Sequence, residues 1–130
     1  MDGGRGPGGP AGTVHALDRT RVYYACVDGG DVEGVLDWFA DDGVYYRPGY
    51  APMRGRAALS AFYGGERVIE SGRHTLHEVL VDGLRVAVRG TFDGTLKDGS
   101  TVSVGFADLV RYGADGRAVE RHSFFDTPAV

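Results

Sequence analysis

Three Asp-Gly dipeptides divide the second half of the chain into four segments rich in Val, Leu, Phe and Thr. Asp-Gly between two such segments is a strong signal for a tight turn in a β-hairpin. Three successive hairpins predict a meander of four antiparallel strands, at about residues 74–81, 84–96, 101–112 and 117–125. The turns are Asp82-Gly83, Asp98-Gly99 and Asp115-Gly116, and Gly94 is a candidate for a bulge inside the second strand.

The first half of the chain has helical spacing instead. One helix is expected over residues 13–28, where Gly29-Gly30 ends the apolar pattern. Asp31 is a good N-cap for a second helix, whose apolar positions lead to an expected end near Asp42-Gly43. The remaining expected elements are a short strand at 44–47, a third helix at 57–63 and a further helical turn at Val68 and Ile69.

Helices that precede long strands indicate an α+β fold with three N-terminal helices packed on one face of a curved sheet. The 130 residues suit one domain, expected at 13–130 after a Gly- and Pro-rich disordered tail at 1–12 without a secretory signal. The net charge of -4 and the absence of a long apolar run argue against nucleic acid and membrane partners. The single Cys26 suits a reducing compartment, so a cytoplasmic location is expected.

Asp108 is the main polar anomaly of the predicted sheet. It shares the apolar face of its strand with Val104 and Phe106, because side chains alternate along a strand. A buried carboxylate must be paired, neutral or at the wall of a cavity. The alternatives are therefore a structural ion pair with an arginine and a functional site.

Two other strands carry polar residues, and the alternation of side chains does not show whether these residues are exposed or buried. Arg89 and Asp93 lie on a polar face of the second strand, which is either solvent-exposed or part of a site. In the last strand Arg121 and Phe125 share one face and His122 lies on the other, and parity does not decide which face is buried. The histidines are too scattered for metal-ligand spacing, so no metal is expected.

Several segments resemble the ketosteroid isomerases and SnoaL-like polyketide cyclases, whose fold is the cone of nuclear transport factor. Residues 23–33 with 39–42 resemble the opening of that family, 54–56 with 61–63 its third helix, and 108–112 with 115–117 its closing hairpin. The resemblance covers about residues 13–125. It implies a cone-shaped, curved antiparallel or mixed sheet with the helices on its concave face. It does not imply one reaction, because this fold serves many activities.

The resemblance also implies roles for individual residues. Tyr23 matches the oxyanion-hole tyrosine of the isomerases and Asp108 their protonated oxyanion aspartic acid, both hydrogen-bond donors to an enolate. Arg47 stands where the isomerases have their general base, and we expect it to be a clamp for negative charge, paired with Asp108 or Asp93. If Arg47 reaches Asp108, that carboxylate is ionised and could be the base. The expected substrate-binding residues, an apolar and aromatic lining with some polar groups, are Phe39, Tyr45, Phe62, Tyr63, Arg89, Asp93, Val104, Phe106, Arg121 and Phe125.

These residues favour a cofactor-independent isomerase or cyclase of secondary metabolism. Its substrate would be a hydrophobic, carbonyl-bearing small molecule of polyketide or steroid type, and a pericyclic cyclisation would also fit. The alternatives are an epoxide hydrolase or dehydratase of the same fold and a non-catalytic ligand-binding or association domain. For the epoxide hydrolase, the resemblance implies an arginine between two aspartates; the candidates Arg89 and Asp93 lie four positions apart here, whereas that family has the pair two apart. We also expect a homodimer that pairs through the outer face of the sheet. That face carries Thr101, Ser103 and Arg111, which predict a mixed polar interface rather than an apolar one.

Overall fold

The fold, determined as a computed structural model, is described for residues 10–128. Residues 1–9 of the expected tail lie outside the described residues, whereas Pro10 to Gly12 belong to the first helix. Helix α1 (Pro10–Asp28) is followed by α2 (Val32–Trp38), and Gly30 separates them with a positive φ of 74°. The Asp31 carboxylate caps α2 by accepting a hydrogen bond from the Gly34 N–H at 2.9 Å.

Within the described residues, six strands form one mixed, curved sheet that does not close. The strand order is β2-β1-β6-β5-β4-β3, in which β1 runs parallel to β6 and every other neighbouring pair is antiparallel. The strands are β1 (Phe39–Tyr46), β2 (Met53–Arg54), β3 (Ile69–Asp82), β4 (Arg85–Leu96), β5 (Thr101–Tyr112) and β6 (Ala118–Phe125). The predicted meander is therefore present as β3 to β6.

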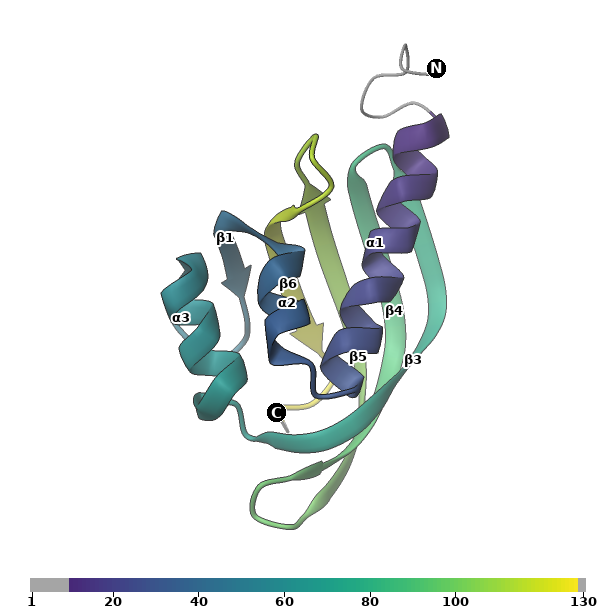
Figure 1. The fold of residues 1–130 in the computed structure, drawn as a ribbon. Coiled ribbons are helices and arrows are strands. Elements are labelled where there is room, and N and C mark those ends of the chain that lie inside the picture. Colours follow the sequence, from purple (N-terminus) through teal and green to yellow (C-terminus); the bar gives the residue numbers. More distant parts are fainter. Residues whose placement is uncertain (1–9, 129–130) are drawn as a thin grey trace.

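The helices cover one face of this sheet, as Figure 1 shows. Helix α1 lies along β3 and β4, while α3 (Gly55–Ala61) packs beside β1. Helix α2 lies between them, and the indole Nε1 of Trp38 donates a hydrogen bond to the Arg19 carbonyl oxygen of α1 at 2.8 Å. The expected α+β cone with helices on the concave face is confirmed.

The predicted end of the second helix is wrong. Helix α2 stops at Trp38, and Phe39 has extended backbone angles of φ -78° and ψ 148°. Phe39 begins β1 and pairs with Ala118 of β6, a residue far along the chain. The helical spacing correctly indicated that the Phe39 side chain is buried. Its backbone is extended because it pairs with β6, which is distant in the chain.

The region between β1 and the meander also differs from the prediction. Helix α3 ends at Ala61 and is continued by a π-helical turn, η1 (Phe62–Glu66). The expected helical turn at Val68 and Ile69 is wrong, because Ile69 starts β3 and pairs with Leu96. Strand β3 is consequently five residues longer at its start than its apolar alternation indicated.

The predicted bulge at Gly94 is wrong as well. Gly94 pairs regularly with Gly72 on one side and with Val102 on the other. The irregularities lie in β3, where the pairing with β4 shifts between Ile69 and Ser71 and between Leu76 and Glu78. Gly94 is required for another reason: a Cβ there would lie 2.4 Å from the Phe92 ring.

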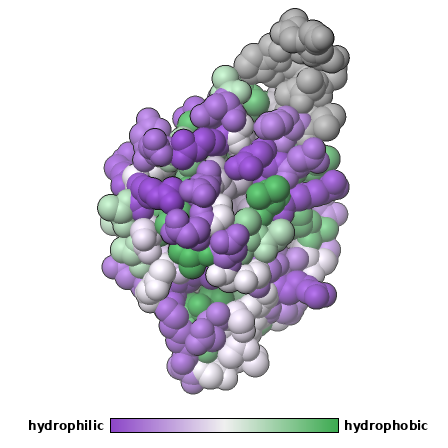
Figure 2. All heavy atoms as spheres, in the orientation of Figure 1, coloured by the Kyte–Doolittle hydropathy of each residue, from purple (hydrophilic) through white to green (hydrophobic). Residues whose placement is uncertain are grey.

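The core lies between the helices and the concave face of the sheet. It contains many aromatic side chains, among them Trp38, Phe39 and Phe62, each at most 1% exposed. On the helix-covered side of the molecule, hydrophilic residues form most of the surface, with hydrophobic ones scattered among them (Figure 2). None of the helices in the described residues is long and apolar enough to cross a membrane.

Candidate active site

The site begins with two neighbouring strands whose polar side chains face the helices. Asp108 of β5 pairs across the sheet with Ser123 of β6, and Val110 pairs with Arg121. Asp108 is 1% exposed, Ser123 3% and Arg121 4%. Arg121 and Ser123 of β6 therefore face the helices, so the buried face of this strand is the one that carries Arg121.

Asp108 accepts hydrogen bonds from three side chains. The Arg121 Nη2 donates to Oδ2 at 2.8 Å, the Ser123 Oγ donates to Oδ1 at 2.5 Å, and the Tyr24 hydroxyl of α1 donates to Oδ2. An adjacent guanidinium and hydroxyl donors stabilise the ionised form of a carboxyl group. Asp108 therefore accepts hydrogen bonds from all three partners, an arrangement that differs from the donor role implied by the resemblance.

Arg121 is held from both sides by aromatic rings. Its guanidinium carbon lies 4.3 Å from the ring centre of Tyr23 and 4.5 Å from that of Tyr45, a cation–π arrangement. Burial alone would lower the pKa of Arg121, but the charge of Asp108 and the neighbouring tyrosines hold that pKa well above its ordinary value. The group is thus a permanent, fixed positive charge inside the protein.

Two tyrosine hydroxyls meet beside Arg121. Tyr23 of α1 and Tyr63 of η1 are joined at 2.7 Å, and the Arg121 Nη1 donates to the Tyr63 oxygen at 3.4 Å. One hydrogen bond between two hydroxyls uses one of their two protons, so one O–H remains available to a ligand. Burial raises the pKa of both hydroxyls, although Arg121 opposes the shift, so both keep their protons at neutral pH.

A histidine and an aspartate form a second polar pair at the end of α1. The Asp28 carboxylate accepts a hydrogen bond from the His74 Nδ1 at 2.6 Å and another from the His74 backbone N–H at 2.8 Å. The imidazole packs against the rings of Phe92 and Phe106, with centres 4.7 and 5.2 Å away. Asp28 therefore fixes the ring and its tautomer, and the Nε2 has no hydrogen-bond partner among residues 10–128.

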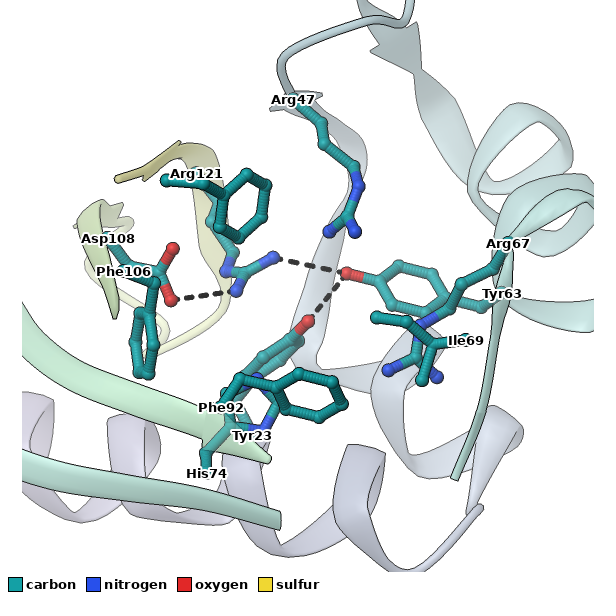
Figure 3. Close-up of a pocket in the computed structure, with 11 residues that line it drawn as sticks. Tyr23, Arg47, Tyr63, Arg67, Ile69, His74, Phe92, Phe106, Asp108 and Arg121 are labelled. Atoms are coloured by element: carbon teal, nitrogen blue, oxygen red, sulfur yellow. Dashed lines mark hydrogen bonds and ion pairs between the residues drawn. The ribbon is translucent and has the colours of Figure 1, made fainter. Parts of the chain in front are cut away.

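These groups line one small cavity, shown in Figure 3. Its volume is about 20 Å³, which is enough for roughly one water molecule. The apolar pocket for a polycyclic ligand stays a prediction, because the described cavity is small and its lining combines apolar side chains with charged and hydroxyl-bearing ones. The lining consists of Tyr23, Arg47, Tyr63, Arg67, Ile69, His74, Phe92, Phe106, Asp108, Arg121 and Phe125.

Arg47 lies in the cavity wall but does not have the expected partner. Its Nη1 donates to the Tyr45 hydroxyl at 3.0 Å, and its guanidinium lies over the rings of Phe125 and Phe62, at 4.9 and 5.3 Å. The predicted ion pair of Arg47 with Asp108 or Asp93 is wrong, since Arg121 pairs with Asp108. The Tyr45 hydroxyl also joins the Ser123 Oγ at 2.7 Å, so Arg47 reaches Asp108 only through two hydroxyls.

Of the residues expected to bind substrate, Tyr63, Phe106, Arg121 and Phe125 line the cavity. Arg89 and Asp93 do not: both are exposed on the opposite face of β4, where Arg89 pairs with Glu78 at 3.3 Å. Their predicted place in the site is wrong, because the even-numbered positions of β4 are the buried ones. The remaining four residues are buried in the core behind the cavity and are not part of its lining: Phe39, Tyr45, Phe62 and Val104.

The prediction missed Tyr24, Ser123, His74, Asp28 and Arg67. Asp28 carried a usable signal, because a carboxylate at the end of a helix opposes the helix dipole and needs a partner. Ser123 shares its strand face with Arg121, which also suggested a polar buried stripe. The contact between His74 and Asp28 joins segments 46 positions apart, and no local pattern indicates it.

Among residues 10–128, no group of three or more His, Cys, Asp or Glu side chains is placed to hold a metal ion. Most of the polar groups of the site are instead donors: three guanidinium groups and two tyrosine hydroxyls, beside one imidazole and one carboxylate. Such a set stabilises negative charge on a bound molecule.

Comparison with known proteins identifies a protein family and several solved structures that this chain resembles. A family model described as a SnoaL-like domain matches residues 20–121. A structure of an NTF2-like protein of unknown function from Burkholderia pseudomallei is similar, with a TM-score of 0.78, 25% identity and coverage of 86% of this chain and 91% of that one. A search of curated proteins gave no match.

Two further similar structures have functional descriptions. TerC, co-crystallised with polyporic acid, is 26% identical with a TM-score of 0.77, over 88% of this chain and 94% of that one. SalBIII, described as an epoxide hydrolase/cyclase-like enzyme in pyran ring formation in polyether salinomycin, has a TM-score of 0.76. It is 19% identical, covers 86% of this chain and 91% of that one, and supports the fold alone.

Proposed function

Because the chain belongs to the SnoaL-like family, we propose that it is a cofactor-independent enzyme that removes a proton next to a substrate carbonyl. The resulting enolate would lead to isomerisation or cyclisation of a small hydrophobic compound. One observation carries this proposal: an aspartate-oriented imidazole and a spare tyrosine proton belong to the wall of the same cavity. The co-crystallisation of TerC with polyporic acid is consistent with a small organic ligand in this fold.

His74 is the proposed general base. The His74 Nε2 lone pair takes the proton from the carbon next to the carbonyl, while the Nδ1–H stays bonded to Asp28. The electrons of the broken C–H bond form a carbon–carbon double bond, and the carbonyl oxygen becomes an enolate oxygen. Asp28 stabilises the imidazolium that results, as a carboxylate does in other histidine-based sites.

The tyrosine pair and Arg121 are the proposed stabilisers of the enolate oxygen. The free O–H of the Tyr23–Tyr63 pair donates to this oxygen, and the positive charge of Arg121 lies directly behind the pair. Asp108 does not react; it anchors Arg121 and is itself fixed by Tyr24 and Ser123. These donors are held in place before the reaction, so little reorganisation is needed when charge develops.

The last step distinguishes the possible outcomes. If the substrate has a carbon–carbon double bond next to the deprotonated carbon, His74 can return its proton to the far end of that bond, which moves the double bond in an isomerisation. If the enolate carbon instead attacks a second carbonyl of the same molecule, a carbon–carbon bond forms, the ring closes, and the new alkoxide takes the proton. If a hydroxyl group leaves from the carbon next to the deprotonated one, it takes the proton of His74 and departs as water, the carbonyl group re-forms, and the reaction is a dehydration.

The observed contacts disfavour the epoxide hydrolase alternative. The resemblance implies for that reaction an arginine placed between two aspartates. Among the described residues Arg121 contacts one aspartate, Asp108, and the other candidates, Arg89 and Asp93, lie on the opposite face of the sheet. The proposed acid–base reaction relies instead on the observed contacts of His74 with Asp28 and of Tyr23 with Tyr63.

Deuterium exchange tests the proposal without knowledge of the natural substrate. The protein is incubated with 2-tetralone in D₂O at neutral pH, and loss of the protons next to the carbonyl is followed by NMR against a buffer control. We expect exchange above the buffer rate, and we expect His74→Gln to reduce the enzymatic part by roughly a hundredfold or more. Tyr23→Phe should reduce it less, because Tyr63 can still donate.

His77→Gln is the matched control. His77 lies on the same strand but is exposed, and its Nε2 contacts the Thr91 hydroxyl at 2.8 Å rather than the cavity. Its exchange rate should equal that of the wild type. Wild-type exchange no faster than buffer, or full exchange in His74→Gln, would contradict the proposed function.

A further inference from the structure

Arg67 occupies a position that the proposed reaction does not use. It follows η1 and precedes β3, and its backbone N–H donates to the Phe62 carbonyl oxygen at 3.0 Å. Its side chain lines the inner cavity together with Tyr23 and Tyr63, and in Figure 3 it lies beside Tyr63 and Ile69. Arg67 is partly exposed, unlike Arg121.

The same side chain also lines a second, outer hollow. This hollow has a volume of about 380 Å³ and lies between residues 65–68 and residues 96–98, at the hairpin that joins β4 to β5. Arg67 is the residue common to the inner cavity and the outer hollow among the described linings. It therefore stands at the boundary between the reactive groups and a space large enough for part of a small molecule.

The positive charge of Arg67 has no ion-pair partner among the described residues. The single carboxylate in the lining of the inner cavity, Asp108, is paired with Arg121 rather than with Arg67. In the outer hollow, Asp98 is turned to Ser100, whose N–H and hydroxyl donate to it at 2.9 and 2.6 Å. Neither these groups nor Glu66 forms an ion pair with Arg67 within residues 10–128.

We propose that Arg67 binds a carboxylate of the substrate at this boundary, so that the substrate class is an aromatic or otherwise hydrophobic keto acid. A guanidinium group matches a carboxylate in shape and can form two parallel hydrogen bonds with it. The ketone oxygen would occupy the space for about one water molecule in the inner cavity, next to His74 and the tyrosine pair. The apolar part would contact Ile69 and Phe92 of the lining. This inference rests on the proposed function for the location of the reacting end.

Electrostatic attraction also favours the binding of a carboxylate at Arg67. A carboxylate that enters beside Arg67 is attracted by this guanidinium, and the attraction is stronger in a poorly solvated site than in water. Arg67 already acts electrostatically on its neighbours, because it opposes the rise that burial causes in the pKa of Tyr23. A neutral ligand of the same shape would gain none of this attraction.

The test compares two probes that differ only in charge: 3-benzoylpropionate and 3-benzoylpropionamide. Binding of each is measured by NMR titration of the intact protein, with the side-chain Nε–H signals of the arginines as reporters. We expect the acid to bind the wild type about tenfold or more tightly than the amide, since a charged hydrogen-bonded pair typically contributes that much. We expect the Arg67 signal to shift on titration with the acid.

Arg67→Gln should weaken the acid to the level of the amide and leave the amide unchanged, and Arg67→Lys should retain part of the preference. Arg89→Gln is the matched control, because Arg89 is an exposed arginine on the opposite face of the sheet. Thermal unfolding of each variant establishes that it is folded. Equal binding of acid and amide, no binding of the acid at millimolar concentration, or a preference that survives Arg67→Gln would overturn the inference.

The two proposals fail in different experiments. Deuterium exchange of 2-tetralone that depends on His74, without any preference for the acid, would retain the acid–base function and reject the anion site. A preference for the acid that depends on Arg67, without any exchange, would do the reverse.

Discussion

Asp108 and Arg121 are the two residues on which the geometry of the site depends. Both are almost fully buried, and each would be a costly isolated charge without the other. Their pairing at 2.8 Å fixes Arg121 between the rings of Tyr23 and Tyr45. The pair thus has a structural role that places positive charge at the cavity.

Asp108→Asn should be strongly destabilising. The variant leaves the Arg121 guanidinium buried without its counter-charge, and breaking a buried pair in this way typically costs about 3–5 kcal/mol. Urea unfolding at neutral pH measures the change in the free energy of unfolding. Asp93→Asn removes a carboxylate from the exposed face of β4 and should change stability by less than about 0.5 kcal/mol. Equal stability of the two variants would show that Asp108 is not the anchor described above.

At the scale of the elements, glycines in β3 and β4 allow two aromatic rings to lie against the sheet. A Cβ at Gly90 would be 2.8 Å from the Phe106 ring and 2.3 Å from the Thr75 carbonyl oxygen. A Cβ at Gly72 would be 2.3 Å from the Phe92 ring. These two rings flank His74, so the close approach of ring to backbone determines where the imidazole lies.

Gly90→Ala should therefore damage both stability and the site. The added methyl group meets a backbone oxygen, which moves only with the strand, so we expect a loss of about 1–3 kcal/mol in the free energy of unfolding. The signals of the His74 ring in NMR spectra should shift as well. Gly64→Ala is the control, because a Cβ at Gly64 meets nothing within 4 Å. A Gly90→Ala protein as stable as Gly64→Ala would contradict this account of the strand packing.

At the scale of the whole molecule, the outer face of the sheet carries exposed apolar side chains. Leu80 of β3 is 61% exposed, Leu109 of β5 47% and Phe124 of β6 52%. The register places Leu80, Ala87, Leu109 and His122 side by side across four strands, and a hollow of about 410 Å³ lies over them. The polar residues expected at a dimer interface, Thr101, Ser103 and Arg111, are exposed on β5 with Leu109.

We expect the homodimer predicted from the sequence to use this face. Light scattering at high micromolar concentration should give twice the chain mass of 13.9 kDa. Leu109→Arg should give the monomer mass, because it introduces a charge into the apolar centre of the interface. Val22→Arg changes a residue that is 39% exposed on α1 and should leave the mass of the wild type unaltered. A monomeric wild type, or a Leu109→Arg protein that is still dimeric, would exclude this interface.

Much of the fold could be predicted because its signals are local. The Asp-Gly turns marked the hairpins, and Gly83, Gly99 and Gly116 all have positive φ values there. The alternation of β5 correctly placed Asp108 on the buried face with Val104 and Phe106. Turn chemistry and side-chain alternation depend on residues next to one another in the chain, so they can be read before the fold is known.

The sequence by itself thus determined the order of the main helices and strands, without the short β2, together with the family resemblance and the presence of a buried carboxylate. Only the tertiary structure decided that Arg121 rather than Arg47 pairs with Asp108, that Phe39 is extended, and that Asp28 orients His74. Each of these contacts joins residues that are distant in the chain, and several side chains of suitable chemistry compete for each partner. Which of them meets its partner depends on strand register and helix placement, which come from the packing of the whole molecule rather than from any local pattern.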